Sequence, residues 1–129
     1  MDSPLRVLLV DDDPVVLEVT RAVLESMGHP TTTHDRGLGT SSVVAKVKPH
    51  IVLLDVELPG LDGDELVDLI HENQWKEDQP WPAVILHSGM EHDELQQLAQ
   101  KSGARGALSK THDIETFKMQ FREIVESLS

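Results

Sequence analysis

Cysteine and tyrosine are absent from this 129-residue sequence, and other large aromatic side chains are few. Without cysteine the chain cannot form a disulfide framework or a thiolate metal site. Two phenylalanines and two tryptophans leave valine, leucine and isoleucine to build most of the core. The hydrophobic fraction of 39% is sufficient for an ordinary core, and the length indicates one compact domain over residues 1–129.

Excess positive charge and long apolar runs are also absent. The 11 lysines and arginines stand against 23 aspartates and glutamates, which gives a net charge of −12 at pH 7. Direct binding to nucleic acid or to an anionic membrane is disfavoured, because both need a basic surface. The apolar runs fall well short of the roughly 18 residues of a membrane span, and the acidic N-terminus does not resemble a signal peptide. We therefore expect a soluble, cytoplasmic protein.

Short apolar runs are the main feature of the pattern. Such runs are typical of strands that are buried on both faces of a parallel sheet. A weaker and more polar run at Thr31–His34 predicts a strand near an edge. The apolar runs are Leu5–Val10, Ile51–Leu54, Ala83–Leu86 and Arg105–Ser109.

Helical signals follow the first of these runs. Asp13 suits the N-cap of a helix, Pro14 suits its first position and Gly28 suits its end. Apolar residues at helical spacing predict its buried stripe. They are Val16, Val19, Val23 and Met27, widened by Leu17, Thr20 and Leu24.

Two further helices are predicted in the middle of the chain. Val43, Val44 and Val47 suggest a short helix, although a β-branched run leaves a strand possible. Asp62 and Glu65 fit a capping pattern at the start of the next helix. The inward residues of that helix are Leu66, Leu69 and Ile70.

The last third of the chain predicts a loop and two helices. The polar, proline-containing loop covers residues 73–82, and its Trp75 and Trp81 either cap the sheet edge or anchor a partner. Ser88 and Glu91 fit a capping box before a helix that carries Leu95, Leu98 and Ala99. The terminal helix has one stripe at steps of three and four, formed by Ile114, Phe117, Phe121, Ile124 and Leu128.

Strand and helix therefore alternate five times, which predicts an α/β fold with a parallel sheet between two layers of helices. Right-handed crossovers leave few topologies for such a chain. The strand order 2-1-3-4-5 is common at this size, and its crevice lies between the first and third strands.

Polar residues stand directly after the apolar runs. Asp11 and Asp12 follow the first predicted strand, Asp55 the third, Ser88 the fourth and Lys110 the fifth. In a parallel sheet these residues converge on one edge. Three carboxylates in one crevice repel each other unless one is protonated or a cation lies among them, and oxygen ligands favour Mg²⁺. A carboxylate nucleophile with a hard cation, an ammonium and a hydroxyl is the set that phosphoryl transfer needs.

The whole chain resembles the response-regulator receiver domain, the CheY-like fold of two-component signalling. The motifs that carry the resemblance are LLVDDDP, LLDVELPGLDG, ILHSG and GALSK, in this order and over the full length. The resemblance implies that Asp55 is the phosphoacceptor, that Ser88 hydrogen-bonds the phosphoryl group and that Lys110 pairs with it. It also implies that Mg²⁺ binds Asp12, Asp55 and the backbone carbonyl of Glu57, with Asp11 acting through a bound water.

The resemblance also implies partners. Members of this family take the phosphoryl group from a sensor histidine kinase or a phosphotransfer histidine, accept small phosphodonors, and slowly hydrolyse their own aspartyl phosphate. We therefore expect a signalling module rather than an enzyme with an external substrate. The expected contact face for a downstream protein combines the fourth helix, the fifth strand and the terminal helix, and a homodimer is possible.

Three positions depart from the family pattern. Thr111 replaces the proline that usually follows the lysine, and we expect a trans bond before it, since cis costs roughly 2.5–4 kcal/mol at a non-proline residue. Ala107 replaces the aromatic residue whose ring usually moves in the switch, so that ring is absent. Glu57 places a carboxylate two residues after the acceptor, where it can crowd or repel the phosphoryl group or bind the cation. We expect altered dephosphorylation as a result.

Two alternative functions remain open from the sequence. The first is a pseudo-receiver, a protein-interaction module with an intact pocket whose switch is uncoupled by Ala107 and Thr111. The second, less favoured, is a haloacid-dehalogenase-like phosphatase, which also has an aspartate nucleophile at a strand end. That family needs a second aspartate two residues on, where this chain has Glu57.

Overall fold

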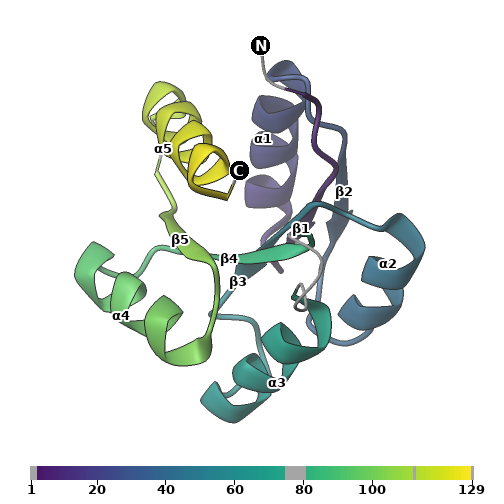
Figure 1. The fold of residues 1–129 in the computed structure, drawn as a ribbon, viewed down its shortest axis with the longest axis vertical. Helices are drawn as coiled ribbons and strands as arrows, with labels where there is room; N and C mark the ends of the chain where they lie inside the picture. The colour runs from purple at the N-terminus through teal and green to yellow at the C-terminus, as the bar shows by residue number, and fades with distance from the viewer. Residues whose placement is uncertain (1–2, 75–80, 112, 129) are drawn as a thin grey trace.

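The computed structural model describes residues 3–74, 81–111 and 113–128, in which five strands and five helices alternate along the chain (Figure 1). The strands are β1 (Val7–Val10), β2 (Thr31–His34), β3 (Ile51–Asp55), β4 (Ala83–Ser88) and β5 (Gly106–Ser109). The helices are α1 (Pro14–Ser26), α2 (Thr40–Val47), α3 (Gly63–Asn73), α4 (His92–Ser102) and α5 (Ile114–Leu128). The segment with Val43, Val44 and Val47 is thus a helix.

The strands form one parallel sheet in the order β2-β1-β3-β4-β5, which confirms the predicted topology. Helices α1 and α5 cover one face, and α2, α3 and α4 cover the other (Figure 1). The register pairs Val10 with Leu54, Asp55 with His87, and Ser88 with Ser109. Because neighbouring strands end at nearly the same level, the residues that follow them share one edge of the sheet.

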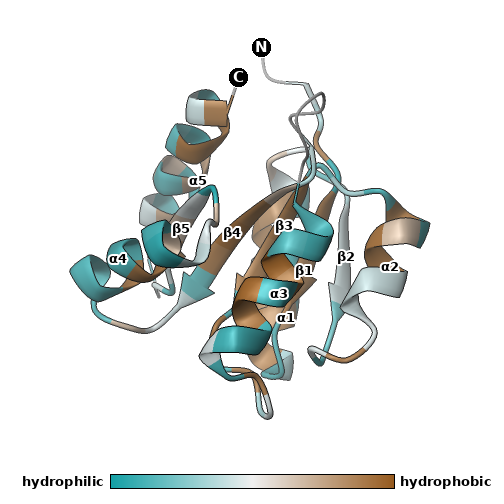
Figure 2. Cartoon of the chain, turned by 60° about the horizontal axis from the view of Figure 1, so that its bottom comes forward, coloured by the Kyte–Doolittle hydropathy of each residue, from teal (hydrophilic) through white to brown (hydrophobic). Residues whose placement is uncertain are grey.

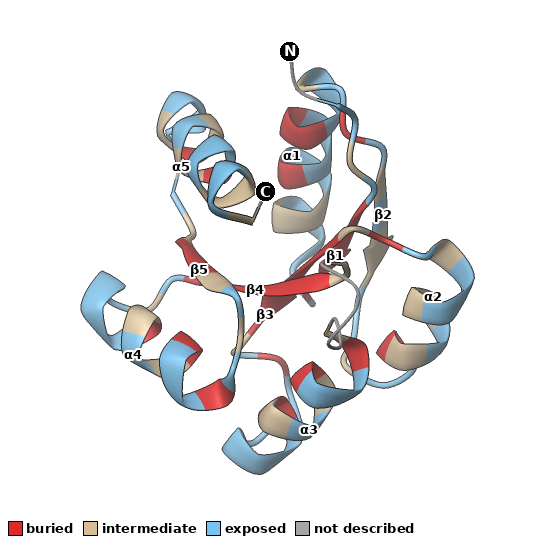
Figure 3. Ribbon diagram, viewed as in Figure 1, coloured by how far each residue is buried: buried red, intermediate tan, exposed pale blue. Residues whose placement is uncertain are grey.

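The core lies on both faces of the central strands. Strands β1, β3 and β4 are buried at every position, whereas most of each helix surface is exposed (Figure 3). Figure 2 shows the same division in hydropathy, with apolar strands beneath helices whose outer faces are hydrophilic. The two phenylalanines, Phe117 and Phe121, belong to the cluster under α1 and α5, and aliphatic residues form nearly all the rest. The core is therefore built from valine, leucine and isoleucine, as the composition predicts.

Side chains cap the starts of α1, α3 and α4, with one correction to the sequence prediction. The Asp13 carboxylate caps α1 by accepting the backbone N–H of Val15 at 2.9 Å, as expected. The predicted capping box of Ser88 and Glu91 is wrong, because Glu91 itself is the N-cap of α4. Ser88 is the last residue of β4, so a short turn separates it from the helix and leaves its hydroxyl for another contact.

The buried face of α1 is narrower than its sequence predicts. Its buried residues are Thr20, Val23 and Leu24, whereas Val19 is 50% exposed although its spacing places it on the inner stripe. The N-terminal halves of α1 and α5 leave a cavity of about 600 Å³ between them, and Val19 lines it. Hydrophobic spacing identifies one side of a helix, but the position of the neighbouring helix decides how much of that side is covered.

The predicted loop at 73–82 lies mostly outside the described residues, and so does Trp75. Trp81 packs against the cluster under α1 and α5, and its ring meets the ring of His50 edge-on with centroids 5.5 Å apart. Within the part of the chain that the structure describes, none of the helices combines the length and apolar character needed to cross a membrane.

Candidate functional site

Three carboxylates meet where β1 and β3 end. Asp11 directly follows β1 and is fully buried, and Asp55 ends β3 with 2% of its surface exposed. Asp12 is exposed at the same edge. One carboxylate oxygen from each of the three lies within 4.8 Å of the others. The sheet therefore brings together the three acids that the sequence places after separate strands.

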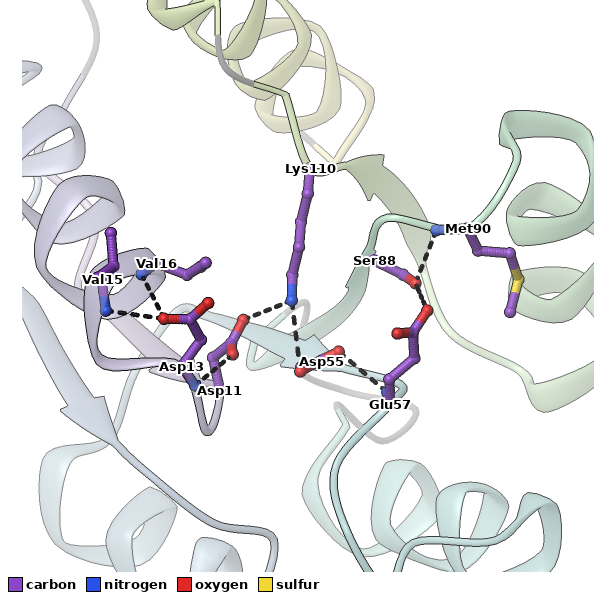
Figure 4. Close-up of polar contacts among 9 residues, drawn as sticks. All are labelled: Asp11, Asp13, Val15, Val16, Asp55, Glu57, Ser88, Met90 and Lys110. Atoms are coloured by element: carbon purple, nitrogen blue, oxygen red, sulfur yellow. Dashed lines mark hydrogen bonds and ion pairs between the residues drawn. The ribbon is translucent and has the colours of Figure 1, made fainter.

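Lys110 lies between the two buried acids. Its Nζ is 2.8 Å from Asp11 Oδ2 and 3.4 Å from Asp55 Oδ2, and Figure 4 shows its side chain extended from the end of β5 to these carboxylates. The backbone N–H of Lys110 donates to the carbonyl of Ser88, which holds this end of β5 against β4. The ammonium thus offsets part of the charge that the two acids would otherwise leave uncompensated.

Burial and charge act on the pKa values of these groups. Burial raises the pKa of Asp55 above its usual value and the Asp11 carboxylate adds to the increase, although the N–H of Glu57 and the Lys110 ammonium oppose it. Burial alone lowers the pKa of Lys110, but the hydrogen bond to Asp11 and the charges of both acids outweigh it, so the net change is upward. Lys110 is therefore positively charged at neutral pH.

Asp55 and Asp11 are also held by backbone groups. The N–H of Glu57 donates to Asp55 Oδ1 at 2.9 Å, and the N–H of Asp13 donates to Asp11 Oδ1 at 2.9 Å. Each acid thus has one oxygen fixed by the turn that follows its strand and the other directed toward Lys110. This arrangement keeps both carboxylates in place in the crevice between β1 and β3.

Ser88 is buried at the same edge, but its hydroxyl contacts Glu57. Ser88 Oγ donates to Glu57 Oε1 at 3.0 Å, and the N–H of Met90 donates to Ser88 Oγ at 3.1 Å (Figure 4). The sequence places Glu57 beside the site but does not predict this bond. The register of β3 and β4 would have indicated it, because pairing Asp55 with His87 brings the chain after β3 alongside Ser88.

The two other departures from the family pattern are local. The cis peptide bond within the described residues precedes Pro82, and the bond between Lys110 and Thr111 is trans, as predicted. Ala107 is 8% exposed and borders a hollow of about 240 Å³ between α4, β5 and α5, together with Gln120 and Ile124. The small side chain therefore leaves unfilled space on this face.

The carboxylate cluster fits a hard divalent cation. Asp11, Asp12 and Asp55 supply closely spaced oxygen donors and no nitrogen or sulfur, which is the set that Mg²⁺ prefers. The exposed Asp12 leaves the group open to solvent on one side, and Mg²⁺ usually keeps several waters. The residues present therefore match what a magnesium site requires.

His87 is a buried titratable residue beside this site that the sequence does not mark as functional. It lies on the same face of β4 as Ile85, is 2% exposed, and its ring packs edge-on against Phe117 with centroids 6.2 Å apart. Burial lowers the pKa of His87 to about 4, and the Lys110 ammonium acts in the same direction. The imidazole is therefore neutral at pH 7.

The cavity between α1 and α5 opens beside Lys110. Its apolar lining includes Val15, which is 67% exposed, Val19, and Ile114, which is 46% exposed. Asp13 and Lys110 also line it. An exposed apolar surface therefore lies directly next to the carboxylate cluster.

Comparison with known proteins gives consistent matches. A family model described as the response regulator receiver domain matches residues 7–122. The C4-dicarboxylate transport transcriptional regulatory protein DctD of Pseudomonas aeruginosa is 31% identical over 125 residues, which cover 97% of this chain and 26% of that protein. Protein PilH of the same organism is 30% identical over 112 residues, which cover 86% of this chain and 89% of PilH. The chain thus spans about a quarter of one curated relative and most of another.

A solved structure agrees with these sequence matches. The crystal structure of the BeF3-activated N-terminal receiver domain of RstA from Klebsiella pneumoniae superimposes with a TM-score of 0.74 at 27% identity, covering 91% of this chain and 95% of that chain. These matches favour neither the pseudo-receiver nor the phosphatase alternative.

The burial of His87 predicts a specific loss of stability in acid. Its pKa is about 4 in the folded protein and near 6.5 when unfolded, so the unfolded chain binds more protons between these values. The free energy of unfolding should therefore fall as the pH is lowered from 6.5 to 4, by about 3 kcal/mol from this residue alone. Urea unfolding of the wild type and of His87→Leu over this range measures the difference. Equal pH slopes for the two proteins would contradict the assignment.

Proposed function

The chain belongs to the response regulator receiver domain family, and from that premise we propose that Asp55 is the residue that accepts a phosphoryl group. Receiver domains are generally non-enzymatic signalling modules, and phosphorylation and Mg²⁺ binding are general to the family. The donor that we propose is a sensor histidine kinase or a phosphotransfer protein. A downstream protein then binds the phosphorylated form.

The main support for this proposal is that the Lys110 ammonium lies next to the buried Asp55 carboxylate. Asp55 Oδ2 lies 3.4 Å from the Lys110 ammonium, and the Glu57 N–H fixes its other oxygen. In the transfer, an Asp55 oxygen forms a bond to phosphorus while the bond from phosphorus to the donor's imidazole nitrogen breaks. The electron pair of that bond stays on the imidazole. The Lys110 ammonium can then pair with a phosphoryl oxygen and balance its charge.

The cation in this proposal is Mg²⁺. Asp12, Asp55 and the backbone carbonyl of Glu57 would hold it, with Asp11 acting through a water. When bound, the ion offsets the negative charge of the carboxylates and of the phosphoryl oxygens. Asp11 already pairs with Lys110 at 2.8 Å, so this residue also orients the ammonium toward the acceptor. Self-phosphorylation from small phosphodonors and slow hydrolysis of the aspartyl phosphate complete the proposed activity.

We assign donor docking to the exposed apolar residues around the cavity between α1 and α5. Val15, Val19 and Ile114 surround the approach to Lys110, so a partner that covers them would bring its phosphohistidine to the acceptor. The downstream protein would use the opposite side of β5, the face of α4, β5 and α5. There the hollow beside Ala107 offers space for a partner side chain.

Loss of the acceptor should abolish phosphorylation. Incubation with acetyl phosphate and Mg²⁺ should label the wild type, and labelling should fall to background in Asp55→Asn or when EDTA removes the metal, because the nucleophile or the charge compensation is lost. Intact-protein mass spectrometry measures the added mass. Asp64→Asn, which changes an exposed acid in α3, serves as the control and should label normally. Undiminished labelling of Asp55→Asn would reject the proposal.

A negative charge at the docking surface should slow phosphoryl transfer from a protein donor but not from a small phosphodonor. The donor in this test is a phosphorylated histidine protein that labels the wild type. Val19→Glu should slow transfer from this donor by about tenfold, because the new carboxylate is buried against the partner's apolar face. Labelling by acetyl phosphate should be unchanged. Leu38→Glu is the matched control, since Leu38 is 84% exposed and does not line this cavity. Equal slowing by both variants, or by neither, would reject docking at this surface.

A further inference from the structure

The hydroxyl group of Ser88 is occupied by a carboxylate of the protein itself. Ser88 Oγ donates to Glu57 Oε1 at 3.0 Å and accepts the backbone N–H of Met90 at 3.1 Å (Figure 4). Ser88 is fully buried, whereas Glu57 is exposed. The one proton that this hydroxyl can donate is therefore already used before any phosphoryl group is present.

We propose that Glu57 is a positioning residue that holds the Ser88 hydroxyl in the unphosphorylated protein and competes with the phosphoryl group for its proton. The inference rests on the proposed function, in which Ser88 hydrogen-bonds the phosphoryl group on Asp55. A serine hydroxyl carries one proton, so it can donate to Glu57 or to a phosphoryl oxygen but not fully to both. Phosphorylation must therefore break the bond between Ser88 and Glu57.

Release of Glu57 has a direct electrostatic consequence. The phosphoryl group carries roughly two negative charges in place of the single charge of the Asp55 carboxylate, and the freed carboxylate of Glu57 would face it without a donor of its own. The Glu57 backbone cannot easily follow, because its N–H is bonded to Asp55 and the next residue, Leu58, is buried in the core. The side chain is therefore the part that moves, and its exposed position allows it to turn toward solvent.

This movement supplies a switch where the usual one is absent. Ala107 has no ring that could rotate inward when Ser88 changes partner. In this chain the change of partner at Ser88 instead frees a charged side chain in the turn between β3 and α3. The phosphorylated state is then marked by an outward Glu57 carboxylate next to the site.

Replacing the carboxylate by a neutral amide tests the competition. Beryllofluoride with Mg²⁺ is the probe, because it stands in for the phosphoryl group on the acceptor. Glu57→Gln should bind it about tenfold tighter than the wild type, because an uncharged acceptor holds the Ser88 proton less strongly than a carboxylate does. Glu57→Ala should bind at least as tightly. Isothermal titration measures the dissociation constants.

A control variant and a second background separate the hydrogen bond from general charge effects. Glu72→Gln is the matched control, because Glu72 accepts a serine hydroxyl bond from Ser41 at 2.9 Å on the α2 and α3 side. It should not alter binding. In a Ser88→Ala background the gain from Glu57→Gln should shrink by at least half, since there is no longer a hydroxyl proton to compete for.

A metal-free measurement reports the bond in the resting protein. The backbone amide of Met90 donates to Ser88 Oγ, so its NMR chemical shift should change in Glu57→Gln and Glu57→Ala but not in Glu72→Gln. An unchanged Met90 shift, unchanged or weaker beryllofluoride binding, or an equal gain in the Ser88→Ala background would overturn the inference while leaving Asp55 as the acceptor. Failure of the wild type to bind beryllofluoride would instead overturn the proposed function, and this inference with it.

Discussion

The ammonium group of Lys110 lies between the carboxylates of Asp11 and Asp55, two acids that the sheet buries at neighbouring strand ends. Two uncompensated carboxylates at this depth would repel each other. The lysine allows both to remain at the edge of the sheet, and the exposed Asp12 leaves the cluster accessible from solvent. Parallel pairing and nearly level strand ends make this contact possible, so the fold and the site depend on the same register.

The two sides of the carboxylate cluster have different roles in the proposed function. On the α1 and α5 side, apolar residues, Lys110 and the neutral, buried His87 line the cavity, and its exposed residues form the proposed surface for a donor. On the β4 side, Ser88 donates to Glu57 in the turn after β3, and the N–H of Glu57 donates to Asp55, the proposed acceptor. The absence of an aromatic ring at Ala107 shifts the proposed signal from the outer face of β5 toward this turn.

The positions of the strands and of the polar residues at their ends were predictable because they follow from patterns among residues close together in the sequence. The apolar runs before Asp11, Asp55 and Lys110 have the length and composition of buried parallel strands, and alternation with helices leaves few topologies. The exposure of Val19 and the hydrogen bond from Ser88 to Glu57 were not predictable in the same way. Both depend on distances between elements far apart in the chain, which periodicity and capping preferences do not contain.

We propose that the acids at the ends of β1 and β3 form one ion-binding site rather than part of a diffuse acidic surface. Titrating Mn²⁺ into ¹⁵N-labelled protein and recording paramagnetic broadening tests this directly, because the effect falls off steeply with distance from the ion. A single site at these acids should give selective broadening of the amides of residues 11–13 and 55–57, reversed by excess Mg²⁺. Broadening centred instead on the acidic helix α3, or spread evenly over the surface, would contradict it.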